Sequence, residues 1–96
     1  MVTWSDHAKV DLRHIHDFIA ADSRHYAKKV TQAIVDKTLQ LSELPRIGKV
    51  VPEINDEDIR ELHLYSYRIL YEVKADHIHV LAVVHRRQDF QPDDLP

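Results

Sequence analysis

The sequence predicts a small α+β domain, in which a short N-terminal strand and a hairpin of two helices lie on one face of an antiparallel sheet. Two observations predict this order of elements. Apolar residues recur at helical spacing through the first half of the chain, and their period changes to two after residue 58. With 96 residues in total, the whole chain 1–96 is expected to form a single domain.

The N-terminal segment predicts a strand followed by a helix. Residues 2–4 form a short apolar start that is typical of a strand. Ser5 is a good helix N-cap, and Asp6 places a negative charge in the first turn, where it interacts favourably with the helix dipole. Apolar residues then share one face, so we expect an amphipathic helix over residues 6–21.

A second helix is expected directly afterwards. Asp22 or Ser23 can cap it, and Pro45 ends it. Because only two or three residues join the two helices, they are expected to pack as an antiparallel hairpin. The apolar stripe of the second helix is wide, so it is expected to touch neighbours on two sides. The stripe consists of Tyr26, Val30, Ile34, Leu41 and Leu44, broadened by Val35 and Leu39.

The second half of the chain predicts a loop and then three strands. Residues 45–58 contain two prolines and the only glycine and are expected to form a loop. Strands are expected at 59–65, 67–74 and 77–85, and the joints between them are so short that consecutive strands must be antiparallel. Residues 88–96 carry two prolines and three aspartates and are expected to be irregular.

Composition excludes several classes of protein. The net charge is −3, whereas nucleic-acid-binding domains usually carry a basic excess, so any such role would need a local cationic patch. No cysteine is present, and neither a signal peptide nor an apolar run long enough to cross a membrane is recognisable. These features predict a cytoplasmic protein without a membrane-embedded segment.

The eight histidines raise the question of a metal site. His14 and His16 are two residues apart on a predicted helix and therefore do not face each other. His77 and His79 point the same way on a predicted strand, but no third ligand stands at a completing spacing. Exposed strand histidines are the simpler explanation, and we expect neither a metal nor a cofactor.

Arginines interrupt the predicted sheet. Arg60 and Arg68 lie within strands, and Arg87 follows the last strand. A charged side chain in a small sheet is costly unless it is paired or faces water. From the pattern alone, an ion pair is the simpler explanation for Arg68. The candidate carboxylates are Glu53, Glu61 and Glu72.

The alternative explanation is a site that cleaves RNA without a metal. Attack of a 2′-hydroxyl on the adjacent phosphate needs a base, an acid and cations around the pentavalent phosphorus. Glu53 or His85 would serve as base or acid, and the arginines at positions 60, 68 and 87 would stabilise charge. All of these residue types are common, so the set does not by itself define an activity.

Five motifs occur in order along residues 3–89: W-S-x-x-A-x-x-D-L-x-x-I-x-x-F-I, L-x-x-x-P-x-x-G-K-x-V-P-E, I-R-E-L, Y-R-I-L-Y-E-V and I-x-V-L-A-V-V-H-R-R. Together they resemble the ParE/RelE superfamily of bacterial type II toxins. The resemblance implies an α-helical hairpin packed on a curved antiparallel β-sheet. It also implies a growth-inhibiting toxin that a cognate antitoxin, encoded beside it, neutralises by wrapping around it.

The resemblance leaves two mechanisms open. RelE-like members cut mRNA on the ribosome, and Glu53, Arg60, Arg68, His85 and Arg87 occupy positions where such members carry functional groups. ParE-like members instead inhibit DNA gyrase by binding and have no catalytic residues of their own. A degenerate toxin that only binds its antitoxin is a third alternative.

The ParE-like branch is favoured here. The chain is acidic overall, whereas ribosome-dependent members tend to be strongly basic. After the last strand they often carry a tyrosine or histidine, but this chain has Phe90, which cannot exchange a proton. The V-V-H-R-R-Q-D ending is similar to ParE-like sequences. The expected target-binding residues are Arg60, Arg68, His85, Arg86 and Arg87, and DNA gyrase is the expected target.

Overall fold

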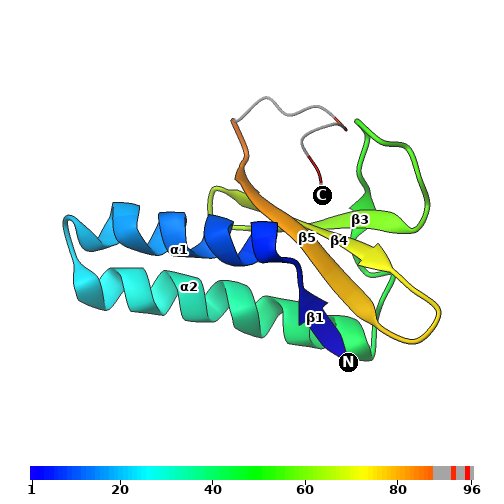
Figure 1. The fold of residues 1–96 in the computed structure, drawn as a ribbon, viewed down its shortest axis with the longest axis horizontal. Coiled ribbons are helices and arrows are strands. Elements are labelled where there is room, and N and C mark those ends of the chain that lie inside the picture. The colour runs from blue at the N-terminus through cyan, green and yellow to red at the C-terminus, as the bar shows by residue number, and fades with distance from the viewer. Residues whose placement is uncertain (88–91, 93–94, 96) are drawn as a thin grey trace.

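A computed structural model of the chain describes residues 1–87, Pro92 and Leu95. Figure 1 shows two long helices side by side along one face of a twisted sheet. None of the described helices is long and apolar enough to cross a membrane. In chain order the elements are β1 (Val2–Trp4), α1 (Asp6–Ala20), α2 (Arg24–Leu39), the 3₁₀ helix η1 (Gln40–Ser42), β2 (Lys49–Val50), β3 (Ile59–Leu64), β4 (Tyr67–Val73) and β5 (Ile78–His85).

The predicted α+β fold is confirmed, and the sheet adds two features that were not predicted. Strands β3, β4 and β5 form the predicted antiparallel meander within the order β1-β5-β4-β3-β2. The sheet is nevertheless mixed, because β1 runs parallel to β5. β1 is followed by a helix and not by a tight turn, so local connectivity does not impose an antiparallel pairing on it.

The segment 45–58 was expected to be a loop only, but it contains β2, which pairs antiparallel with β3. Two residues are too few to show a strand period in the sequence. The predicted helix boundaries hold to within a few residues, since α2 ends at Leu39 and η1 continues it towards Pro45. Phe90 and most of the tail 88–96 lie outside the described residues.

The start of α1 completes the hydrogen bonding of β5 where β1 ends. The Ser5 hydroxyl accepts a bond from the amide of Ala8 (3.0 Å) and donates one to the carbonyl of Leu81 (2.9 Å). Further along α1, the Asp11 carboxylate accepts from the amide of Val83 (2.9 Å). These side chains satisfy backbone groups that a longer β1 would otherwise pair, and so they fix α1 against the sheet.

The sheet is apolar on both faces. On the helix side, a cluster that includes Ile34, Ile69 and Tyr71 fills the space between the helices and the strands. On the other face, a smaller cluster is built around Leu70 and Val51. Side chains alternate along β4, so Arg68 lies on the same face as Leu70. Arg68 and its neighbours occupy the remainder of that second face.

Tyr71 fastens the loop that precedes β2. Its hydroxyl donates to the carbonyl of Pro45 (2.8 Å) and accepts from the amide of Gly48 (3.0 Å). Burial raises the pKa of the Tyr71 phenol, so its proton remains available for donation. A Cβ at Gly48 would lie 2.5 Å from the backbone oxygen of Glu61 and 2.7 Å from the Tyr71 hydroxyl. Glycine is therefore required at position 48 for close approach to β3.

Gly48→Ala is expected to lower the free energy of unfolding by about 1–3 kcal/mol, because the added methyl group forces β3 and the loop apart. Urea denaturation followed by circular dichroism measures the effect. Asn55→Gly is the control, since Asn55 lies in the same segment with a φ of 57°, which glycine adopts readily. Equal stability of the wild type and Gly48→Ala would contradict the packing argument.

Candidate functional site: a cationic corner and a groove between the helices

The structure places Arg68 and His85 on opposite faces of the sheet. Tyr67 pairs with His85 and Arg68 pairs with Val84, so the alternation of side chains separates the two functional candidates. The His85 ring lies on the helix side, edge-to-face with the Tyr67 ring at a centroid distance of 5.7 Å. Arg68 points to the other face.

Arg68 is held between two carboxylates. Its guanidinium donates to both oxygens of Glu53 (2.7 and 2.8 Å) and to both oxygens of Glu61 (3.2 and 2.5 Å). His63 makes a further short contact with Glu61. Arg68 is 8% exposed and Glu61 is 3% exposed. The ion pair expected as the simpler explanation of Arg68 is therefore present, with Glu53 and Glu61 as partners.

The pKa shifts within this network follow from the same contacts. Hydrogen bonds from Arg68 hold the pKa of Glu53 below its ordinary value. Burial acts to raise the pKa of Glu61, but hydrogen bonds from Arg68 and His63 outweigh it and leave that pKa lowered. Hydrogen bonds to Glu53 raise the pKa of Arg68 in turn. The guanidinium is thus charged, and its charge is neutralised within the fold.

Arg60 is likewise engaged by the protein itself. Its guanidinium donates to the carbonyl of Glu57 (2.9 Å) and to the carbonyl of Gly48 (2.9 Å). These bonds tie β3 to both ends of the segment that includes β2. Arg60 therefore stabilises the segment between β2 and β3.

The end of β5 presents two exposed guanidinium groups beside a histidine. His85, Arg86 and Arg87 are all exposed, and together with Ser66 they line a hollow of about 630 Å³. The amide of Arg87 donates to His85 Nδ1 (3.1 Å), and the amide of Arg86 donates to the carbonyl of Ser66 (2.7 Å). Among the residues that the structure describes, the guanidinium groups of Arg86 and Arg87 have no ion-pair partner. We call residues 85–87 the cationic corner.

The residues of the ribonuclease alternative are not brought together. Glu53 and Arg68 neutralise each other on one face, while His85 lies on the other. Arg60 shares the face of His85, but it pairs with Tyr71, whereas His85 pairs with Tyr67 near the opposite end of β4. These five residues therefore cannot all contact one phosphate group.

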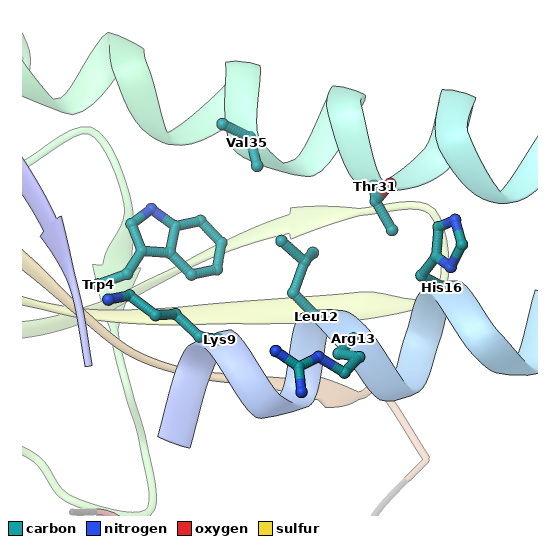
Figure 2. A pocket seen from close by; sticks show the side chains of 7 residues that line it. All are labelled: Trp4, Lys9, Leu12, Arg13, His16, Thr31 and Val35. Carbon is teal, nitrogen blue, oxygen red and sulfur yellow. The ribbon is translucent and has the colours of Figure 1, made fainter. Parts of the chain in front are cut away.

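A groove between α1 and α2 is the second candidate surface, and its residues were not singled out as a site from the sequence. Figure 2 shows the Trp4 ring and the side chains of Leu12 and Val35 directed into the space between the helices. The groove has a volume of about 550 Å³. On the α1 side, Lys9, Arg13 and His16 line it with basic groups. Thr31 completes the lining.

The histidine pair considered for a metal is bonded to other groups. His79 Nδ1 contacts the Thr3 hydroxyl (2.7 Å), and His77 Nδ1 contacts the Asp76 carboxylate (2.6 Å). The two rings are 6.3 Å apart. Across residues 1–87 and the two described tail residues, no group of three potential ligands gathers around a common point.

A helical hairpin on a five-stranded sheet, with an apolar groove on one side and exposed cations at a strand end, defines a small domain suited to binding other macromolecules. Residues 2–90 match the family described as the ParE toxin of the type II toxin-antitoxin system, parDE, and the chain belongs to this family. It is accordingly a toxin of the type II toxin-antitoxin class, as the resemblance of its motifs implied.

A solved structure described as the chromosomal ParDE TA system from P. aeruginosa shares the fold. The TM-score is 0.73 at 24% sequence identity, over 88% of this chain and 92% of that chain. Among curated proteins, no match was found.

Proposed function

We propose that this toxin inhibits DNA gyrase by binding to it, in the bacterial cytoplasm and without a metal or cofactor, and that a cognate antitoxin neutralises it. Membership of the ParE toxin family supports the proposal. The observation that carries the target-binding role is the cationic corner, where Arg86 and Arg87 are exposed on a backbone fixed by hydrogen bonds. Arg60 and Arg68 act as supports, because their guanidinium groups already bind protein groups.

The ribonuclease alternative has less support. Its proposed base Glu53 is the ion-pair partner of its proposed cation Arg68, so neither is available to a phosphate. His85 faces the other side of the sheet. Binding, and not general acid–base chemistry, is what this arrangement favours.

We propose that the antitoxin places an amphipathic helix in the groove between α1 and α2. An apolar floor of Trp4, Leu12 and Val35 suits the apolar face of such a helix. The basic side chains on the α1 side, Lys9 and Arg13, suit acidic residues along its edge.

Purified toxin is expected to block gyrase supercoiling and to accumulate cleaved plasmid. Arg86→Ala/Arg87→Ala is expected to raise the toxin concentration needed for half-maximal inhibition about 10-fold, because two charged contacts with gyrase are lost. Lys28→Ala/Lys29→Ala removes the same charge from an exposed part of α2 and should behave as the wild type.

Normal supercoiling at a large excess of folded wild-type toxin would overturn the gyrase proposal. A parallel cell-free translation assay separates the alternative mechanism. Cleavage of mRNA only when ribosomes are present would establish the ribonuclease function instead.

A further inference from the structure

We propose that the junction between the helical hairpin and the β3–β4 turn binds a short segment of single-stranded nucleic acid, with bases on exposed aromatic rings and phosphates on Arg86 and Arg87. The inference deepens the proposed function, because it assigns a chemical class of ligand to the cationic corner. It rests on three features of the junction: its aromatic lining, the backbone at Tyr65 and the position of the cations.

Aromatic side chains surround a hollow of about 320 Å³ at this junction. Phe18 is 79% exposed, Tyr26 49% and Tyr65 47%, and Tyr67 lies beside them. We call this site the aromatic hollow. Large exposed rings gathered from two helices and a turn are unusual in a domain of this size, and they offer open π-faces on which bases stack.

The backbone at Tyr65 has a conformation that does not favour tyrosine. Tyr65 and Ser66 form the two-residue turn between β3 and β4, and Tyr65 has a φ of 54°. Glycine or asparagine adopts this left-handed conformation with less strain than tyrosine does. Since nearly half of the Tyr65 side chain is exposed, burial in the core does not offset the strain. An exposed residue kept in a strained conformation points to a contact outside the chain.

The cationic corner adjoins the aromatic hollow. Ser66 and His85 line both this hollow and the one that contains Arg86 and Arg87. The bond from the Arg86 amide to the Ser66 carbonyl fixes the position of the cations relative to the turn. Among the described residues, no carboxylate lines either hollow. The phosphates of a strand whose bases stack in the aromatic hollow would therefore meet positive charge at the adjoining cationic corner.

A single strand fits this geometry better than a duplex or an acidic peptide. A duplex hides its base faces, so the aromatic rings would remain unused. It would also bring many phosphates close to a chain whose net charge is −3. An acidic peptide would use the cations but has no general need of several exposed rings around one hollow. A single strand uses both features, because its bases stack on the rings and its phosphates contact the cations.

Fluorescence anisotropy of a labelled oligothymidylate of about 12 nucleotides tests the proposal, because single-strand sites of this kind span roughly 4–16 nucleotides. Binding is expected at low salt, with log K falling against log salt at a slope of about −1.4 to −2, as two or three phosphate contacts require. Arg86→Ala/Arg87→Ala is expected to weaken binding about 10-fold and to flatten the slope, whereas Lys28→Ala/Lys29→Ala leaves both unchanged.

Tyr65→Gly separates stacking from folding. Glycine relieves the left-handed strain, so this variant is expected to be at least as stable as the wild type while binding the oligonucleotide about 10-fold more weakly. Tyr65→Phe keeps the ring and should retain binding. Unchanged binding by Tyr65→Gly would show that the ring contributes nothing and would overturn the proposal.

Three further outcomes overturn it: absence of oligothymidylate binding at low salt, tighter binding of a duplex of equal length, and equal competition by a polyglutamate peptide. The supercoiling assay keeps this inference distinct from the proposed function. Gyrase inhibition without oligonucleotide binding removes the inference alone, and oligonucleotide binding without gyrase inhibition removes the proposed target alone.

Discussion

Arg68→Ala is expected to lower the free energy of unfolding by about 3–5 kcal/mol, the usual consequence of removing one partner from a buried ion pair. The side chain of Glu61 is 1% exposed, so its carboxylate would remain in the protein interior, and among the described residues only His63 would still bind it. Glu53 would be affected less, because its side chain is 32% exposed and water replaces the lost bonds. Urea denaturation at neutral pH measures the difference.

The same variant should change how stability depends on pH. In the wild type, the lowered pKa values of Glu53 and Glu61 contribute stability above their ordinary value of 4.5. This contribution is lost as the pH falls through the lowered folded-state values. In Arg68→Ala, burial acts on Glu61 without the guanidinium, which favours the protonated form. The stability gap between the two proteins should therefore narrow on acidification.

Arg86→Ala/Arg87→Ala serves as the control for this experiment, since it removes two exposed guanidinium groups and should change stability by no more than about 0.5 kcal/mol. A stability gap for Arg68→Ala that stays constant between neutral and acidic pH would contradict the role assigned to the carboxylates. If Arg68→Ala lowers the free energy of unfolding by less than about 1 kcal/mol, water replaces the hydrogen bonds of Arg68 at little cost, and the ion-pair network is not important for stability.

Much of the fold was predictable because local signals agreed with one another. The N-cap at Ser5 and the joint at Ser66 correctly marked element ends, although β3 ends at Leu64 and the turn also includes Tyr65, which was expected to belong to the strand. In the strand expected at 67–74, alternation puts Arg68 on one face of the sheet and Tyr67 and Tyr71 on the other, as the structure shows. The parallel pairing of β1 was not predictable, because it depends on contacts between residues more than 70 positions apart and leaves no period in a three-residue strand.

The site was predictable only in part. The sequence offered an ion pair and a catalytic role for Arg68 as alternatives. Only the register of β3 against β4 and the position of the segment after β2 show that Glu61 and Glu53 lie beside it. The groove between the helices was missed, although the sequence contained one signal for it. Val35 lies outside the main apolar stripe of α2, which is why this helix was expected to touch neighbours on two sides. The second of those sides is the groove, which Val35 lines.

Val35→Glu is expected to weaken binding of the antitoxin by about 100-fold, because a charge would be buried against an apolar helix face. Val35 lines the groove and is only half-buried in the free toxin, so the glutamate reaches water until a partner covers it. Calorimetric titration measures the affinity, and growth on co-expression measures rescue.

The matched control is Val10→Glu, which makes the same substitution at a position on α1 that is 46% exposed and does not line the groove. If the groove holds the antitoxin, only Val35→Glu escapes neutralisation, and it does so while its inhibition of the target is unchanged. Rescue of Val35→Glu as complete as that of Val10→Glu would place the antitoxin elsewhere. Loss of both target inhibition and antitoxin affinity would mean that target and antitoxin share the groove, and it would contradict the assignment of target binding to the cationic corner, whose lining residues are different.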